Sequence, residues 1–347
     1  MKAIVQSGPE SIDVVEQERP SIAADEVLIQ VHSTGVCGSD AHAFHYEGGY
    51  EWVQLPRIMG HEYSGEIVEV GDDVDSLSLG DRVVEEPTQT CGTCFQCKSG
   101  QSNVCQNFSV KGMHRNGSYA EYTVGNPEKI HLVPDAVPLE HAAIAEPLSV
   151  AARTVLSQSN LKPGQTALVE GPGPIGTLVA SIADSIGAKV LVSGLGQDEK
   201  YRLPLVEDLG IETVNLSESD LSEVTESFTD GIGFDVVFDS TGHRSGIELG
   251  VEQVRKGGEV IVVGLPGDAS EIALSPVVRS EVSINTSYGS SWENFEQALN
   301  LLEEGVVDAE DIIDTSFEVT NPGEAFSAFF RSETSKPVFS FTELSDT

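Results

Sequence analysis

The sequence predicts an α/β protein with two domains, one β-rich and barrel-like and one built on a parallel sheet. The 347 residues are long for a single hydrophobic core and suit two. Short β-like runs separated by turns fill the chain to about residue 145, and strands then alternate with helices from about residue 160. The tail returns to short strands, so we expect it to complete the first domain around an inserted second one.

The β-rich domain is predicted from closely spaced short strands, which are typical of antiparallel sheets. The first residues, MKAIVQSGPESIDVV, read as a strand followed by a turn. Three further runs are EVLIQVHSTG (26–35), GEIVEVGDDV (65–74) and GDRVV (80–84). The tail KPVFSFTEL (336–344) has the same short-strand character.

The second domain is predicted from compact apolar strands alternating with helices, as in a parallel sheet covered on both faces. The expected strands are TALVEG (166–171), KVLVSG (189–194), FDVVFDSTG (234–242), EVIVVG (259–264) and SINTSYGS (283–290). Helices are expected at 174–188, 199–209 and 245–255, followed by an amphipathic helix at 292–307.

The charge balance is strongly acidic, with 56 acidic and 19 basic residues and a net charge of −37. This excludes a broad nucleic-acid interface and disfavours anionic membranes. No apolar run reaches the ~18 residues of a membrane span, and the first residues lack a signal-peptide pattern, so we expect a cytoplasmic protein. Self-repulsion on such a surface is screened in molar salt, which predicts a halophilic protein; the alternative is an acidic protein indifferent to salt.

Four of the five cysteines lie in CGTCFQCKSGQSNVC, at positions 91, 94, 97 and 105. Four thiolates at this spacing can close a tetrahedral shell around zinc with no open position. We therefore expect Cys91, Cys94, Cys97 and Cys105 to hold a structural zinc. Disulfides and an iron–sulfur cluster are the alternatives.

A second metal site is suggested by three separate sequence motifs: GVCGSD (35–40), MGHEYSGEIVEVG (59–71) and AEPLSV (145–150). A catalytic zinc has three protein ligands and one position for water or substrate. Cys37, His61 and either Glu62 or Glu146 would provide that set. Taken singly, a cysteine is more often buried packing and a histidine a satisfied polar group, so the surrounding words carry the prediction.

These words make the chain resemble the zinc-containing medium-chain alcohol dehydrogenases. The resemblance runs over nearly the whole length and is strongest to the polyol (sorbitol or iditol) and threonine dehydrogenase branch, in a haloarchaeal type. It implies a GroES-like catalytic domain at 1–150 with a zinc lobe at 88–108. It also implies a Rossmann domain at 151–285 and a C-terminal segment, 286–347, that completes the catalytic domain.

The resemblance also implies roles for individual residues. Cys37, His61 and Glu62 would be the ligands of the catalytic zinc, and Glu146 the nearby carboxylate that contacts the zinc directly or through its water. Sequence alone does not decide between these shells. Ser39 would relay the proton, with His42 as a plausible next step or an ordinary surface histidine, and Asp40 would orient the site.

The stretch VEGPGPIGTLVA carries the pattern G-x-G-x-x-G between a predicted strand and a helix, which is the context a dinucleotide requires. An acid expected at the end of the next strand is replaced by Gly194. Loss of that acid favours NADP over NAD; the alternative is that Asp198 or Glu199 substitutes for it. The residues expected to contact the cofactor are Gly171, Gly173, Pro174, Ile175, Gly176, Ser193, Gly194, Lys200 and Arg202.

The expected activity is hydride transfer between a sugar or polyol and NAD(P), with two zinc ions per chain. Oxidation of an amino alcohol such as L-threonine is the alternative, and a non-catalytic NADP- and zinc-binding regulator is a second one. A polar and aromatic stretch at 42–56 suits a hydroxyl-rich substrate. The stretch NTSYGSSW (285–292) could approach the nicotinamide end, and Tyr288 could equally be a packing residue. The resemblance implies a homodimer or homotetramer.

Overall fold

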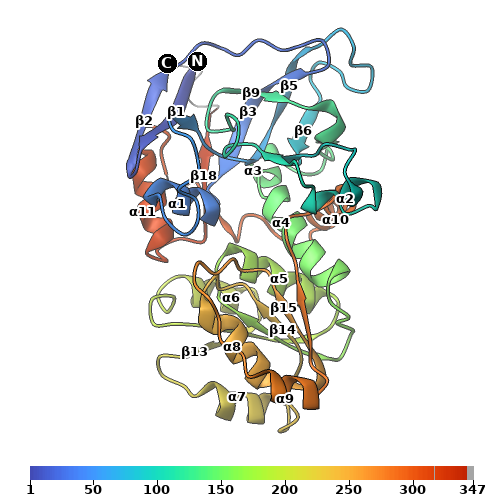
Figure 1. The fold of residues 1–347 in the computed structure, drawn as a ribbon. Helices are drawn as coiled ribbons and strands as arrows, with labels where there is room; N and C mark the ends of the chain where they lie inside the picture. Colours follow the sequence, from blue (N-terminus) through green and yellow to red (C-terminus); the bar gives the residue numbers. More distant parts are fainter. Residues whose placement is uncertain (316, 342–347) are drawn as a thin grey trace. The chain divides into compact units, whose positions relative to one another are not determined.

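The computed structural model describes residues 1–315 and 317–341 and separates the chain into two units (Figure 1). The first holds Met1–Ser149, Ser290–Phe330 and the chain from Lys336, and the second holds Val150–Gly289 and Arg331–Ser335. Of the predicted tail strand, residues 342–344 lie outside the described part. The α/β fold class predicted from the sequence is confirmed.

Apart from one parallel pair at an edge of its largest sheet, the named strands of the first unit pair antiparallel, and its longest strands are buried along much of their length. Its largest sheet has the order β10-β6-β5-β3-β18-β17, with β9 paired to β3. The bounds are β3 (Val27–Gly35), β5 (Glu62–Val70), β6 (Arg82–Glu85), β9 (Tyr122–Gly125), β10 (Ile130–Leu132), β17 (Ile313–Asp314) and β18 (Lys336–Ser340). Two smaller sheets are β2-β1-β4 (Ser11–Glu16, Lys2–Gly8, Arg57–Ile58) and β7-β8 (Thr88–Gln89, Ser109–Val110).

The C-terminal strand β18 runs antiparallel to β3, pairing Val338 with Gly35 and Phe339 with Thr34. It therefore completes the sheet of the first unit from about 300 residues away, with Phe339 buried in the same core as Ile29. This pairing brings the start of β18 beside the start of β5, where Gly35 is the partner of Glu62.

The helices of the first unit are mostly short, and only the one at 292–307 is expected from the sequence. Among the others, α1 (Gly38–His45) follows Cys37 directly. The predicted helix at 292–307 is α10 (Trp292–Glu303), which ends early because Gly305 has φ +65°. The others are α2 (Phe95–Lys98), η1 (Ser102–Val104), η2 (Pro127–Lys129), α3 (Leu139–Ala142) and α11 (Pro322–Phe330); α4 (Ala145–Ala152) and the π-helix η3 (Arg153–Ser157) lead into the second unit.

The second unit is a six-stranded parallel sheet of Rossmann type, with the order β13-β12-β11-β14-β15-β16. Its strands are β11 (Thr166–Glu170), β12 (Lys189–Gly194), β13 (Glu212–Asn215), β14 (Phe234–Asp239), β15 (Val254–Val262) and β16 (Ser283–Thr286). The helices are α5 (Pro174–Ser185), α6 (Arg202–Asp208), α7 (Leu221–Phe228), α8 (Arg244–Gln253) and α9 (Leu274–Arg279). β13, α7 and α9 were not expected from the sequence. The expected end of α5 was three residues too late, because the helix stops at Ser185, ahead of Gly187 with φ +87°.

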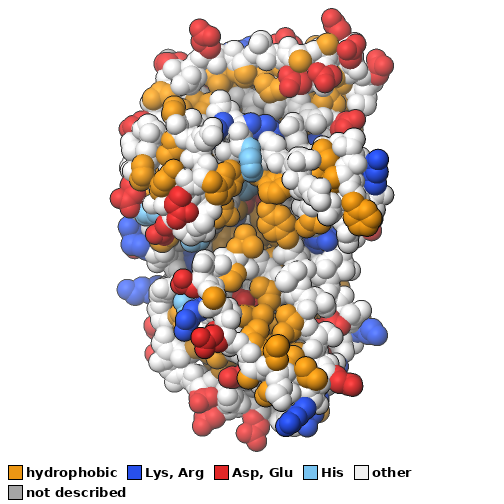
Figure 2. All heavy atoms as spheres, viewed as in Figure 1, with side chains coloured by type: hydrophobic (Ala, Val, Ile, Leu, Met, Phe, Trp, Pro, Cys, Tyr) orange, Lys and Arg blue, Asp and Glu red, His pale blue; other side chains and the backbone are white. Residues whose placement is uncertain are grey.

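The structure agrees with the acidic composition and with the lack of a long apolar run in the sequence. Figure 2 shows Asp and Glu side chains at many separate places on the viewed face. Among the described residues, no helix has both the length and the apolar character needed to cross a bilayer.

Candidate active site and metal centres

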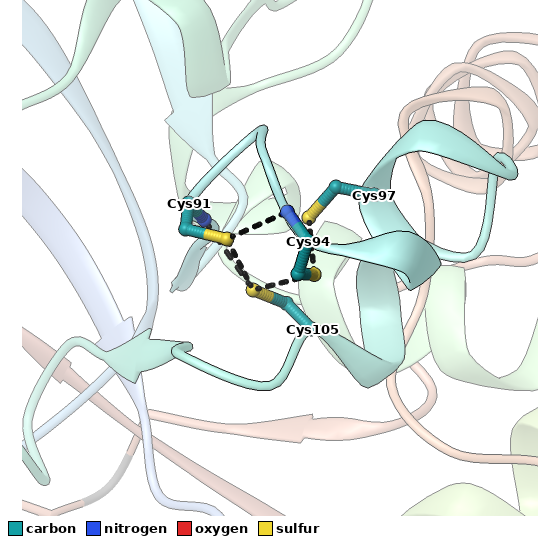
Figure 3. Close-up of side chains that lie close together, drawn as sticks. All are labelled: Cys91, Cys94, Cys97 and Cys105. Carbon is teal, nitrogen blue, oxygen red and sulfur yellow. Dashed lines mark hydrogen bonds between the residues drawn. The ribbon is translucent and has the colours of Figure 1, made fainter.

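Four cysteine side chains converge in the loop between β7 and β8 (Figure 3). The Sγ atom of Cys94 lies 3.5 Å from that of Cys97 and 3.8 Å from that of Cys105, which lies 3.5 Å from that of Cys91. A tetrahedral zinc with bonds of ~2.3 Å places its sulfur ligands ~3.8 Å apart. All four are free thiols, so the group fits a closed zinc shell and forms no disulfide.

This loop has almost no apolar core of its own. Between residues 91 and 105, only Cys105 is buried. Its Sγ accepts hydrogen bonds from the backbone N–H groups of Cys91 and Asn107, both at 3.3 Å. Donors from Thr93, together with the N–H of Cys94, lower the pKa of Cys91 to about 5, which favours the thiolate that a metal binds.

A second group of metal-binding side chains lies where α1 and β5 begin. Cys37 is the N-terminal cap of α1, and His61 and Glu62 stand at the start of β5. One ligand atom from each of these three residues lies within 4.8 Å of the other two. His61 and Glu62 are buried, whereas Cys37 is half-buried, so Cys37 is the one of the three that keeps some contact with solvent.

Buried groups behind this site orient His61. Its Nδ1 lies 3.5 Å from Oδ1 of Asp40, whose side chain is fully buried. The other carboxylate oxygen accepts a hydrogen bond from the hydroxyl of Tyr119 at 2.8 Å and one from the N–H of Cys37 at 3.3 Å. Burial alone would raise the pKa of Asp40, but His61 and these donors hold it below its ordinary value. An imidazole held in this way by a carboxylate presents its other nitrogen to a metal.

Glu62 is held by a lysine that the sequence analysis did not single out. The Nζ of Lys336 donates to both carboxylate oxygens of Glu62, each at 2.8 Å, and to the carbonyl oxygen of Val36 at 3.0 Å. Both side chains are almost fully buried, at 2% and 1% exposure. The only sequence signal is a basic residue at the head of the apolar strand KPVFS, in a chain poor in basic residues.

Glu146, the other predicted carboxylate, lies in the first turn of α4. Burial raises its pKa to about 7; His61 acts against this rise and the Glu62 carboxylate adds to it. Glu146 is therefore close enough to sense the charges of the site. Within the described part of the chain, however, its carboxylate is not among the ligand atoms that cluster with Cys37.

The predicted proton-relay residues both lie on α1. Ser39 is half-buried, two residues after Cys37. The ring of His42 stacks on that of Tyr50, with centroids 6.1 Å apart, and meets Phe330 edge-on at 5.9 Å. Burial lowers the pKa of His42, which favours the neutral imidazole near pH 7.

The glycine-rich turn joins β11 to α5, as its pattern predicts. Gly171 has φ +93°, and Gly173 is the N-terminal cap of α5 with Pro174 at its first position. A Cβ at Gly176 would meet the carbonyl oxygen of Gly171 at 1.9 Å, whereas one at Gly173 would meet nothing within 4 Å. The turn thus packs tightly at Gly176 and leaves open space at Gly173, beside Ile175, which suits a pyrophosphate at the helix N-terminus.

The residues predicted to distinguish NADP from NAD are not gathered at one point. Gly194 ends β12, where a Cβ would meet Cδ2 of Leu203 at 2.9 Å. Ser193 is buried and Lys200 is exposed. Arg202 donates from Nε to the carbonyl oxygen of Thr334 at 3.1 Å and lies 3.8 Å from Asp198. Asp198 in turn accepts from the N–H of Leu195 at 3.0 Å.

Comparison with known families matches two consecutive segments of the chain. Residues 23–135 match the family described as alcohol dehydrogenase GroES-like domain, and residues 174–304 match the family described as zinc-binding dehydrogenase. The first match contains both metal-binding clusters, and the second begins at the helix that follows the glycine-rich turn.

Three curated relatives match almost end to end. A D-arabitol-phosphate dehydrogenase from Enterococcus avium is 34% identical over 94% of this chain and 93% of its own. A sorbitol dehydrogenase from Halalkalibacterium halodurans is 35% identical over 97% and 98%. An L-threonine 3-dehydrogenase from Shewanella woodyi is 31% identical over 98% and 100%.

Solved structures agree with this assignment. A zinc-binding dehydrogenase from Sinorhizobium meliloti bound to NADP is 26% identical and superposes with a TM-score of 0.88 over 98% of each chain. An alcohol dehydrogenase from Escherichia coli complexed with NADH is 28% identical, with a TM-score of 0.89 over 98% of this chain and 99% of its own. The chain therefore belongs to the zinc-containing medium-chain alcohol dehydrogenases, in the branch of the polyol and threonine dehydrogenases, and is an NAD(P)-dependent zinc dehydrogenase.

Proposed function

We propose that this chain transfers a hydride between a hydroxyl or carbonyl group of a sugar or polyol and NAD(P). The observation that carries the proposal is the convergence of Cys37, His61 and Glu62 in front of the buried carboxylate of Asp40. A thiolate, an imidazole and a carboxylate leave one position of a tetrahedral zinc for substrate. Relatives named for D-arabitol phosphate and sorbitol support a hydroxyl-rich substrate.

Between the two candidate carboxylates, we propose that Glu62 completes the zinc shell. Its ligand atom clusters with those of Cys37 and His61, whereas that of Glu146 does not. Glu146 would then act on the water or substrate side of the site. Its raised pKa lets it hold or release a proton near neutral pH.

The residues of the chain divide the chemistry among them. When bound, zinc supplies a Lewis acid for the alcohol oxygen and the nicotinamide supplies a hydride acceptor. Asp40 orients His61 and so fixes the geometry of the ligands. Ser39 Oγ would accept the proton of the substrate hydroxyl as its own hydroxyl proton passes to the imidazole of His42, which would then release a proton to solvent.

A panel of substrates tests the proposed function. Purified, zinc-replete protein would be assayed with polyols, aldoses and L-threonine, each with NAD and with NADP, and its zinc content would be measured. Two zinc ions per chain and turnover of a polyol or sugar are expected. Turnover of L-threonine alone would replace the proposal with the amino-alcohol reading, which the 31% identical relative supports.

We propose NADP as the preferred cofactor, because no acidic side chain ends β12. Gly194→Asp is expected to move the preference toward NAD by at least about tenfold, since a carboxylate there repels a 2′-phosphate and accepts bonds from the ribose. The measurement is the ratio of kcat/KM for NAD and NADP. A new Cβ crowds Leu203 and Pro172, so Gly194→Ala is the matched steric control. A ratio that moves equally in both variants, or in neither, contradicts the NADP assignment.

We propose that the protein is halophilic, on the strength of its net charge of −37. The relatives give no support to a haloarchaeal origin, so the proposal rests on charge alone. The unfolding temperature should rise between 0.1 M and 2 M KCl, because the screening length falls from ~10 Å to below ~3 Å. Sucrose, which stabilises without screening, is the control. An unfolding temperature that does not change with KCl concentration would contradict the proposal that the acidic surface is an adaptation to high salt.

Three further assignments stay with the proposal. The division at about residues 150 and 285 separates a catalytic from a nucleotide-binding domain, and the protein would be cytoplasmic. A homodimer or homotetramer is supported by β16, which lies at an end of its sheet. Its neighbouring helix α9 exposes Leu274 and Val278 at 66% and 71%, and an open edge strand with apolar neighbours pairs readily with a second chain.

A further inference from the structure

The buried ion pair between Lys336 and Glu62 is more than a structural link. The three N–H bonds of an ammonium group have three acceptors here, two oxygens of Glu62 and the carbonyl oxygen of Val36. All three hydrogen-bond donors of the lysine are therefore used, and two of them go to the carboxylate proposed to bind the metal. Each oxygen of a carboxylate has about two lone pairs, so Glu62 keeps capacity for a metal on its other side.

The backbone around this pair leaves room for it. Gly35 is the β3 partner of Glu62, and a Cβ at Gly35 would lie 2.5 Å from Oε2 of Glu62 and 3.4 Å from Cδ of Lys336. Any larger residue would displace the carboxylate. The position of Glu62 is therefore set from two sides, by the space above Gly35 and by the charge of Lys336.

We propose that Lys336 is a positioning residue that holds the Glu62 carboxylate toward the metal and offsets its charge. The inference rests on the proposed metal-binding function of Glu62. With the thiolate of Cys37 and the carboxylate of Glu62 as ligands, their two negative charges would neutralise the charge of a divalent metal ion. The ammonium group of Lys336 makes the net charge of the site one unit more positive. This lowers the affinity for the metal and stabilises the negative charge that develops on a substrate oxygen.

The test is Lys336→Met, which keeps the length of the side chain and removes its charge. Zinc affinity by chelator competition is expected to rise at least tenfold, because a repulsive cation is lost and Glu62 is left without its partner. The visible absorption of the cobalt-substituted protein should shift as Glu62 changes its bonding to the metal. With substrate, kcat should fall at least tenfold while KM changes less. Lys336→Arg, which keeps the charge, should restore all three values.

A matched control is available in the same unit. Lys111 is also buried, at 1% exposure, and its Nζ lies 2.5 Å from the buried carboxylate of Glu85. Lys111→Met removes an equivalent charge from a pair that has no metal-binding partner. It should lower the unfolding temperature without changing zinc affinity or the cobalt spectrum. The four-cysteine site is the internal reference in every variant.

The outcomes separate cleanly. Unchanged or weaker zinc binding in Lys336→Met, with an unchanged cobalt spectrum, would reduce Lys336 to a packing residue and overturn the inference. If Lys336→Met does not fold, Lys336→Gln, which also removes the charge, is measured in its place, and the same rise in zinc affinity and shift of the cobalt spectrum are expected. One zinc ion per chain in the unaltered protein would instead refute the proposed function, whatever Lys336 does.

Discussion

Replacing Cys37 with serine is expected to reduce dehydrogenase turnover by at least about 10³-fold while leaving nucleotide binding intact. A hydroxyl group is a poor zinc ligand compared with a thiolate, so the variant should lose the metal that Cys37, His61 and Glu62 hold. Serine is nevertheless a preferred residue at a helix N-terminus. The start of α1, which Cys37 caps, therefore keeps its structure, and the loss reports on the metal alone.

The measurement pairs kinetics with metal content. Zinc per chain should fall from two to one, and the affinity for NADPH, measured by its fluorescence, should stay within about threefold of the unaltered protein. A matched control is Asp40→Asn, which keeps all three ligands and changes the buried group that faces His61 and accepts hydrogen bonds from Tyr119 and the N–H of Cys37; a loss of about 10–100-fold is expected there. A Cys37→Ser protein that retains two zinc ions and near-normal turnover would end the proposed mechanism.

The structure clusters a cysteine, a histidine and a glutamate that the sequence had already singled out, because the chemistry of zinc limits the choices. Few residue types bind zinc, and Cys37, His61 and Glu62 stand in short words that place two of them next to each other along the chain. The glycine-rich turn was found for a related reason. Position 171 requires a positive φ, and position 176 has no room for a Cβ. Glycine is therefore favoured at both positions, and the spacing between them can be recognised in the sequence.

The residues that support the ligands could not be found in this way. Lys336 reaches Glu62 across 274 positions of sequence, and Tyr119 reaches Asp40 across 79. Their partners are set by the pairing of β18 with β3 and by packing in the core, and no local pattern encodes either. Likewise, α1 was missed because its eight residues mix apolar and polar types without a clear helical stripe.

The preference between NADP and NAD depends both on the residue at position 194 and on residues that are distant from it in the sequence. The sequence shows that Gly194 replaces an acid, and this part of the argument needs no structure. The structure adds that Leu203 and Pro172 fill the space above Gly194, and that Arg202 is turned toward Thr334 and Asp198. Positive charge for a 2′-phosphate would therefore come first from the exposed Lys200, and Arg202 would contribute only after a side-chain rearrangement.

The second large effect is expected at the four-cysteine site. Cys105→Ala should remove one zinc ion per chain and unfold the loop between β7 and β8 locally. Neither α2 nor η1 contributes a buried residue, so the loop has little apolar burial to hold it once the metal is gone. The unfolding temperature should fall by roughly 5 °C or more, and trypsin should cut rapidly after Lys98, which is exposed but lies within α2.

The two zinc sites serve as controls for each other, because each variant removes one ion and leaves the other. Cys37→Ser should keep the trypsin resistance at Lys98 although its turnover is lost, and Cys105→Ala should lose that resistance although the ligands near His61 are untouched. A Cys105→Ala protein with two zinc ions and unchanged resistance would show that packing, rather than metal, holds the loop. The opposite result would mean that a closed metal shell, which takes no part in the reaction, supplies the stability that residues 91–105 cannot provide by burial, since only Cys105 among them is buried.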